Sequence, residues 1–167
     1  MSLTFTLRRL GVSDVAAYRD LRLLGLRSHP SAFGASFEEE VGRPLEWFVE
    51  RLESSAVWGA WLDGDPNLAG VAGLHVSGTA KAMHKGLLWG MFVRPEARGT
   101  GLGASLAGQL LAQARSAVEE VRLSVTTSNA AAVRLYARLG FRPYGVEPRA
   151  LKIGAEYHDE LLMALRF

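Results

Sequence analysis

The residues with the clearest capacity for chemistry form a glycine-dense corner, Arg98-Gly99-Thr100-Gly101-Leu102-Gly103. An apolar run ends just before it at Arg94-Pro95, and a segment with helical periodicity begins within it. Glycines at the start of a helix leave backbone N–H groups open to a ligand, and the helix dipole adds partial positive charge there. The corner therefore predicts a binding site for a phosphate or pyrophosphate.

Two other phosphate-binding patterns do not fit this corner. A P-loop requires a lysine directly after its glycines, and no lysine follows here. A Rossmann fingerprint requires G-x-G-x-x-G at the first strand-to-helix turn, whereas these glycines are spaced differently and lie past mid-chain. The pattern that fits is R-x-x-G-x-G after a strand.

A second group with chemical potential lies in the segment from Asn129 to Phe141. Asn129 and Tyr136 are nearly two helical turns apart, so they share one face of a predicted helix. A phenol, with a pKa of about 10, can protonate a thiolate whose conjugate acid has a pKa of about 8.5. Other interpretations stay open, since Tyr136 also suits a helix core and Asn129 also suits a helix cap.

These two motifs, in this order, resemble the GNAT N-acetyltransferase superfamily. The resemblance rests on R-x-x-G-x-G followed by N-x-x-A-x-x-x-Y-x-x-x-G-F, and it covers roughly residues 85–145. It implies an enzyme that transfers the acetyl group of acetyl-CoA to a primary amine of a small molecule or protein. The amine would attack directly in a ternary complex, and the chain looks like a bacterial-type member of unassigned substrate.

The resemblance also implies roles for individual residues. The backbone around Arg98 to Ala104 would hold the pyrophosphate, and the preceding strand would hold the pantetheine arm beside a bulge marked by Gly90. Tyr136 would be the general acid for the departing thiolate. The expected cofactor-binding residues are Met91, Phe92, Val93, Arg98, Gly99, Thr100, Gly101, Leu102, Gly103, Ala104, Asn129 and Tyr136.

The general base is not assigned by the sequence. Some family members use a carboxylate on the strand before the corner, but residues 86–90 contain no acid. The candidates are Glu38, Glu39, His75, His84 and the cluster 156–160. This gap weakly favours an alternative, a non-catalytic CoA-binding regulatory module.

The acceptor site is expected between residues 29–40 and the last two strands, as the resemblance implies. Acidic side chains in the loop would attract a cationic amine. Phe33, Phe37 and Trp47 would form an apolar wall.

The elements that must position these residues follow from periodicity and turn signals. We expect strands at 4–9, 57–62, 68–76, 87–93, 121–126, 141–153 and 157–167, the sixth interrupted near Glu147-Pro148. Helices are expected at about 14–28, 44–52, 101–118 and 129–139. This order matches the family's α/β (α+β) fold, a mixed, mostly antiparallel seven-stranded sheet splayed between strands 4 and 5, with helices on both faces.

Composition sets further bounds. The length of 167 residues predicts one domain, 1–167, and the absence of cysteine excludes disulfides and thiolate catalysis. No histidine pair has metal-ligand spacing, so no metal is expected. The net charge of +2 with scattered arginines argues against a nucleic-acid partner. The chain has no long apolar run and no signal-peptide pattern, which predicts a cytoplasmic protein without a membrane partner. Relatives are often dimers, so a homodimer stays open.

Overall fold

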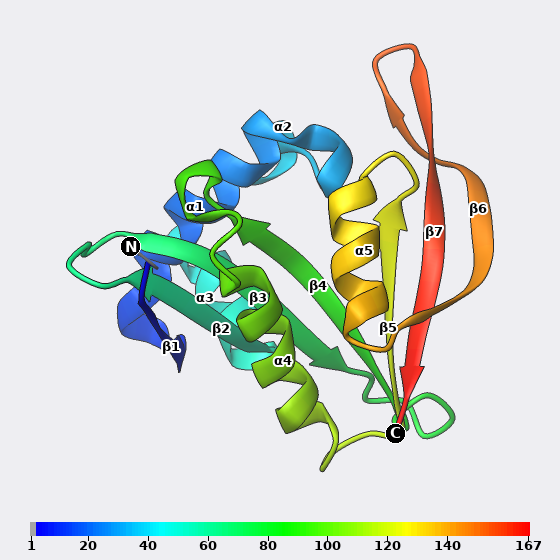
Figure 1. Ribbon diagram of the computed structural model, residues 1–167. Helices are drawn as coiled ribbons and strands as arrows, with labels where there is room; N and C mark the ends of the chain where they lie inside the picture. Colours follow the sequence, from blue (N-terminus) through cyan, green and yellow to red (C-terminus); the bar gives the residue numbers. More distant parts are fainter. Residues whose placement is uncertain (1–2) are drawn as a thin grey trace.

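The computed structural model describes residues 3–167, which form a seven-stranded sheet with helices on both faces (Figure 1). The strand order is β1-β2-β3-β4-β5-β7-β6. The strands are β1 (Phe5–Arg9), β2 (Ala56–Leu62), β3 (Leu68–Val76), β4 (Lys85–Val93), β5 (Glu120–Thr126), β6 (Arg142–Ile153) and β7 (Glu156–Arg166). The α-helices are α1 (Val15–Ser28), α2 (Phe37–Glu40), α3 (Leu45–Ser54), α4 (Leu102–Ala114) and α5 (Ala130–Arg138), with short 3-10 turns η1 (Val12–Asp14), η2 (Pro30–Ala32) and η3 (Pro95–Ala97).

The sheet opens between β4 and β5, as expected for this fold. All other neighbouring strands are antiparallel, but β4 and β5 are parallel and pair only over residues 85–87 and 120–122. Beyond Leu87 and Arg122 the two strands have no register partners on each other. The carboxyl ends of β4 and β5 therefore separate, and the space between them is available to a ligand.

Each face of the sheet carries its own apolar core. One core joins α4 and α5 to the sheet through side chains such as Leu106, Leu110, Leu123 and Met163. The other core lies under α1 and α3 and includes Phe48. Figure 1 shows α4 and α5 in front of the strands and α1 and α3 behind them. The opening between β4 and β5 thus connects two differently built sides of the molecule.

A β-bulge interrupts β4 where the strand borders the opening. Trp89 pairs with Gly73 and Phe92 pairs with Val71, so two residues of β4, Gly90 and Met91, lie opposite one residue of β3. Gly90 has a φ of 64°, a left-handed conformation that favours glycine. The bulge predicted at Gly90 is confirmed, and it redirects the backbone at the place where the pantetheine arm was expected.

The boundaries of two helices refine the expectations. Helix α5 is capped by Asn129, whose side-chain oxygen accepts a hydrogen bond from the Ala132 N–H at 3.2 Å. The expected extension of α4 to Val118 is wrong, because the helix ends at Ala114. There the N–H groups of Ala117 and Val118 both donate to the Ala114 carbonyl, which closes a turn rather than continuing the helix.

Among residues 3–167, no helix is both long and apolar enough to cross a bilayer.

Candidate active site

The opening between β4 and β5 contains a cavity of about 680 Å³. This is within the range of about 300–1,000 Å³ that is usual for small-molecule sites. Its walls come from β4, the glycine corner, β5, α5, the η2 turn and one residue of β7. The lining residues are His29, Ala32, Leu88, Trp89, Gly90, Met91, Phe92, Val93, Ala97, Arg98, Gly99, Gly101, Gly103, Ala104, Leu123, Ser124, Val125, Thr126, Asn129, Ala131, Ala132, Arg134, Leu135, Tyr136, Arg138 and Glu160.

Most of the residues expected to bind the cofactor lie in this lining, but Thr100 and Leu102 do not. The Leu102 side chain is 1% exposed and belongs to the core under α4. Thr100 holds the corner together instead, because its hydroxyl donates to the Ala97 carbonyl at 2.7 Å and accepts from the Leu102 N–H at 3.3 Å. These two side chains shape the corner without facing the cavity.

The corner has the backbone shape expected of an anion-binding loop. Gly99 and Gly101 have φ values of 74° and 86°, which residues with a Cβ rarely adopt. Gly103 differs, because its φ is not positive and a Cβ built there would make only ordinary contacts with Val93 and Leu135. The first two glycines are therefore required by backbone conformation, whereas Gly103 matters only for how closely a ligand can approach.

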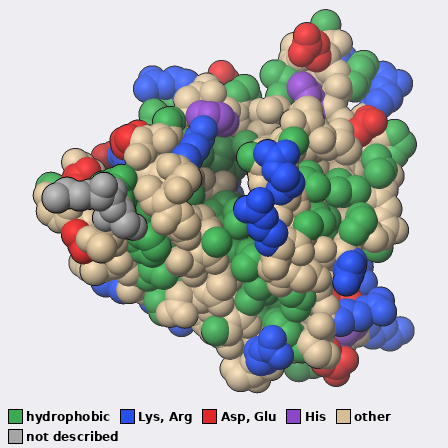
Figure 2. Space-filling model, in the orientation of Figure 1, with side chains coloured by type: hydrophobic (Ala, Val, Ile, Leu, Met, Phe, Trp, Pro, Cys, Tyr) green, Lys and Arg blue, Asp and Glu red, His purple; other side chains and the backbone are tan. Residues whose placement is uncertain are grey.

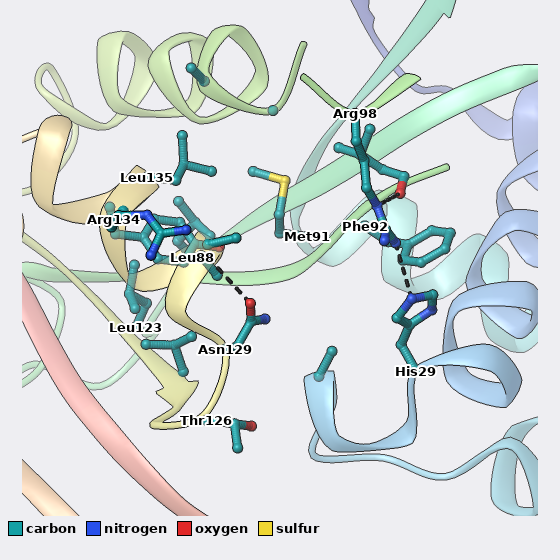
Figure 3. A pocket seen from close by; sticks show the side chains of 18 of the residues that line it. His29, Leu88, Met91, Phe92, Arg98, Leu123, Thr126, Asn129, Arg134 and Leu135 are labelled. Atoms are coloured by element: carbon teal, nitrogen blue, oxygen red, sulfur yellow. Dashed lines mark hydrogen bonds between the residues drawn. The ribbon is translucent and has the colours of Figure 1, made fainter. Parts of the chain in front are cut away.

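The Arg98 side chain bridges two walls of the cavity. Its Nε donates to the Val93 carbonyl at 3.0 Å, and its Nη2 lies 3.2 Å from Nε2 of His29 (Figure 3). The guanidinium also lies over the Phe92 ring, with 5.8 Å between Cζ and the ring centroid. Arg98 thus joins the glycine corner to the turn that follows α1.

The hydrogen-bond network assigns the tautomer of His29. The Ser28 hydroxyl donates to the Leu24 carbonyl at 2.6 Å, so the Nδ1–H of His29, 2.8 Å from Ser28 Oγ, is the donor of that contact. Nε2 then accepts from Arg98. Burial, followed by the positive charge of Arg98, lowers the pKa of His29. The imidazole is therefore held neutral, with its basic nitrogen facing Arg98.

Tyr136 lies on the opposite wall and is 5% exposed. Its ring packs edge-on against Phe141, with centroids 5.7 Å apart. Burial raises the pKa of Tyr136 to about 12, so the phenol keeps its proton throughout the physiological range. Asn129 reaches the same cavity while capping α5, so its two possible roles coexist in one position.

Positive charge surrounds the opening on the side of α4 and α5. Arg134 and Arg138, one turn apart on α5, line the cavity together with Arg98. Figure 2 shows Lys and Arg side chains on either side of a hollow near the middle of this face. Three guanidinium groups around a corner of backbone N–H groups form a site suited to a polyanion.

The candidates for a general base are dispersed by the fold. Glu38 and Glu39 are exposed on α2, where Glu39 accepts a hydrogen bond from the Ser36 N–H. His75 is exposed near the end of β3, and His84 lies in the loop before β4. Of all these candidates, the lining includes only Glu160 from the cluster 156–160.

A buried ion pair supports the wall behind the bulge. The Nε and Nη2 of Arg22 donate to the carboxylate of Glu40 at 2.9 and 2.8 Å, and both side chains are almost fully buried. A Cβ at Gly90 would lie 3.4 Å from Nη1 of Arg22. The pair therefore joins α1 to α2 and packs against the bulge, which fixes the acceptor-side helices relative to β4.

Several lining residues were not singled out by the sequence. His29, Thr126, Arg134 and Arg138 reach the cavity through contacts between distant segments, such as the 69-residue separation of Arg98 and His29. Arg134 and Arg138 had a usable signal, because they lie four residues apart within the second motif and so share one face of its helix. Among residues 3–167, no group of three or more His, Cys, Asp or Glu side chains is placed to hold a metal ion.

Comparison with known proteins gives a consistent result. The sequence pattern of the acetyltransferase (GNAT) family matches residues 20–141. A mycothiol acetyltransferase from Thermobispora bispora is 50% identical over 56 residues, which cover 33% of this chain and 19% of that protein. The chain therefore matches only about a fifth of the length of this curated relative.

Two solved structures illustrate the shared fold. An acetyltransferase of the GNAT family from Streptococcus pneumoniae superposes with a TM-score of 0.85 at 21% identity, covering 98% of this chain and 99% of that one. A putative acetyltransferase from Salmonella typhimurium, solved with its cofactor acetyl-CoA, gives a TM-score of 0.80 at 21% identity and covers 98% and 94% of the two chains. At these identities the likeness concerns the fold.

Proposed function

The chain belongs to the GNAT acetyltransferase family, and from this premise we propose that it transfers the acetyl group of acetyl-CoA to a primary amine of a small molecule or protein. The observation that carries the proposal is the cavity in the splayed sheet, which joins a backbone anion site to a buried phenol. The structural neighbour from Salmonella typhimurium was solved with acetyl-CoA as its cofactor, which agrees with this choice of donor.

The donor end fits a diphosphate. The N–H groups from Arg98 to Ala104 lie at the start of α4, where the helix dipole favours negative charge. Arg98, Arg134 and Arg138 add positive charge around the same opening. We assign the pyrophosphate to this corner, with Met91, Phe92 and Val93 as the edge along which the amide-rich pantetheine arm extends.

The bulge places backbone groups beside the expected position of the thioester. Gly90 and Met91 have no register partner on β3, and from this we infer that main-chain groups of the bulge face the opening. We propose that an N–H of this bulge donates to the thioester carbonyl oxygen and stabilises the negative charge that develops on it. Loss of one such donor in other enzymes costs about 10²–10³ in kcat.

Tyr136 completes the reaction as the general acid. A phenol with a pKa of about 12 remains protonated and can donate to the departing thiolate. Proton transfer from this buried phenol to a thiolate that kept its bulk-water pKa of about 8.5 would be unfavourable by about 5 kcal/mol. Burial disfavours the charged thiolate as well as the charged tyrosinate. The difference between the pKa values of the thiol and the phenol is therefore smaller inside the cavity.

The proposal is tested by measuring thiol release from acetyl-CoA in the presence of a panel of amines. We expect release that depends on both the protein and the amine, and a rise in melting temperature when acetyl-CoA is added. Protection by CoA without turnover of any amine would instead support the non-catalytic CoA-binding module. Absence of both protection and turnover would refute the assignment of the cavity.

A further inference from the structure

The structure brings one carboxylate into the cavity without a cationic partner. Glu160 lies on β7, and in register it stands beside Thr126 of β5 on one side and Glu147 of β6 on the other. Residues directly opposite each other in antiparallel strands place their side chains on the same face of the sheet. Thr126, Glu160 and Glu147 therefore share one face.

A hydrogen bond identifies which face this is. The hydroxyl of Thr126 donates to the Ser31 carbonyl in η2, the turn that follows α1. Glu160 consequently lies on the side of α1 and η2. The α5 side of β5 and β7 instead carries Leu123, Val125 and Met163, which belong to the core under α4 and α5. Glu160 thus lines the cavity from the side opposite to the arginines of α5.

The charges of the cavity are therefore separated. Arg134 and Arg138 belong to α5 on one side of the sheet, whereas Glu160 lies on the other side, with α1 and η2. Among the ion pairs of residues 3–167, none uses Glu160 or Glu147. Glu120 lies at the opposite end of β5 from Thr126, and it is paired with Arg122 and Arg166.

The other basic group in the cavity is already engaged. Nε2 of His29 accepts a hydrogen bond from Arg98, and its Nδ1–H donates to Ser28. His29 would have to lose the Arg98 contact before it could take a proton from a substrate. The carboxylate of Glu160, in contrast, accepts no hydrogen bond from any other group of residues 3–167, so no contact would have to be broken first.

We propose that Glu160 binds the ammonium group of the acceptor and takes its proton, directly or through one water. The inference rests on the proposed function and deepens it. An acceptor that fills the cavity displaces water, and loss of water favours the neutral amine over the ammonium. The lone pair of the neutral amine can then attack the thioester carbonyl.

The protons and bonds of this sequence balance. Glu160 takes one proton from the ammonium, the C–N bond forms, and the C–S bond breaks as the thiolate leaves. Tyr136 protonates the sulfur and recovers a proton from the new amide nitrogen, directly or through water. Glu160 then releases its proton to solvent, so the products are the amide, the CoA thiol and one proton.

The same geometry selects a class of acceptor. Glu147, beside Glu160 on the same face, adds a second negative charge near the opening. A carboxylate attached next to the amine would be repelled by both groups, whereas a second ammonium would be attracted. The preferred acceptors are aliphatic amines and diamines without a neighbouring carboxylate, rather than α-amino acids.

The test compares Glu160→Gln with Glu147→Gln in the full chain. Both residues lie on the same face of adjacent strands, but only Glu160 lines the cavity, so Glu147→Gln is the matched control. With an aliphatic monoamine, which has no second ammonium for Glu147 to attract, we expect Glu160→Gln to lower kcat/KM by about 10²–10⁴, as for loss of a general base. Glu147→Gln should lower it less than about tenfold, as for an exposed charge. Melting temperatures with and without CoA check that both variants fold and bind the donor.

A second measurement separates proton transfer from simple charge attraction. Amines whose conjugate acids have pKa values well below the value of about 10.4 for lysine need less help to lose a proton. The loss caused by Glu160→Gln should therefore shrink along a series of amines of falling pKa. If Glu160→Gln lowers kcat/KM by the same factor for every amine of the series, Glu160 is not the general base and only binds the ammonium group.

The outcomes distinguish this inference from the function on which it rests. If amines are acetylated and Glu160→Gln stays within about threefold of the unchanged protein, Glu160 is neither base nor binding group, while the transferase assignment stands. If α-amino acids are better acceptors than their carboxylate-free analogues, the proposed class is wrong. If the protein binds CoA but acetylates no amine, both proposals fail.

Discussion

The two ends of the cavity are built in different ways. At the donor end, the glycine corner presents backbone groups in one continuous segment, and its side chains either pack inward or brace the loop. At the proposed acceptor end, Glu160, Thr126 and the η2 turn come from three distant segments, and the side chains of Glu160 and Thr126 supply the polar groups. The donor end should therefore respond to changes in backbone conformation, and the acceptor end to changes in side-chain chemistry.

The largest effect is expected where the two ends meet, at Tyr136. Tyr136→Phe keeps the ring packed against Phe141 and removes only the proton donor. Loss of a general acid typically costs about 10²–10⁴ in rate, and we expect this loss in kcat with little change in CoA affinity. Steady-state kinetics with thiol detection measures it. Tyr144→Phe, at an exposed tyrosine of β6, is the control. Equal kcat for the two variants would make Tyr136 a packing residue.

The next effect tests whether the donor end depends on its backbone. Gly101→Ala places a Cβ on a residue with a φ of 86°, where a left-handed conformation costs about 1–2 kcal/mol. If the corner relaxes to avoid this cost, its N–H groups move and CoA affinity falls about fivefold to thirtyfold. Titration calorimetry with CoA measures the change.

The matched control for this prediction is the same substitution at Gly108. That glycine lies inside α4, and a Cβ there would meet nothing within 4 Å. Gly108→Ala should leave CoA affinity unchanged and stabilise the helix by up to about 1 kcal/mol. Equal CoA affinities for the two alanine variants would contradict the backbone role of the corner.

The difference between the ends also explains what the sequence could predict. Gly99 and Gly101 make the corner predictable from the sequence. The two glycines that adopt a left-handed conformation and the helix that follows them lie within a few residues of each other. The order of strands and helices was equally accessible, since hydrophobic alternation and turn residues are local signals. The end of α4 was misplaced, because apolar residues continue past Ala114 through a turn, and the four-residue helix α2 was not among the expected helices.

The acceptor end had no such local signal. Glu160 is one of several acids between residues 156 and 160, and only the register of β7 with β5 places it beside Thr126. In the sequence His29 is a residue of a loop, and only the fold brings it into contact with Arg98. Register and long-range side-chain contacts depend on the whole sheet, so a pattern read along the chain cannot rank these candidates.

A smaller effect tests the side-chain contribution to the donor end. Arg98→Leu removes one exposed positive charge but leaves the glycine backbone unchanged. Exposed charge pairs are worth about 0.2–1 kcal/mol, so CoA affinity should fall by no more than about fivefold. Arg115→Leu, at the far end of α4, controls for the change in net charge. A loss as large as that of Gly101→Ala would mean that the donor end also depends mainly on a side chain.

The smallest effect concerns His29, which joins the two ends. Its folded-state pKa lies below the ordinary value of about 6.5, first because of burial and then because of Arg98. As the pH falls through about 6.5, the unfolded chain takes up a proton before the folded chain does. The stability from the neutral imidazole is therefore present above this pH and lost below it.

Urea unfolding at pH 7.5 and 5.5 measures this contribution. From pH 7.5 to pH 5.5 the free energy of unfolding should fall more in the unchanged protein than in His29→Asn. Because His29 is partly exposed, we expect these two decreases to differ by less than about 1 kcal/mol. His75→Asn, at an exposed histidine outside the cavity, should retain the full pH dependence of the unchanged protein. If His29→Asn keeps that dependence as well, the Arg98 contact does not hold the imidazole neutral, and the link between the two ends is not electrostatic.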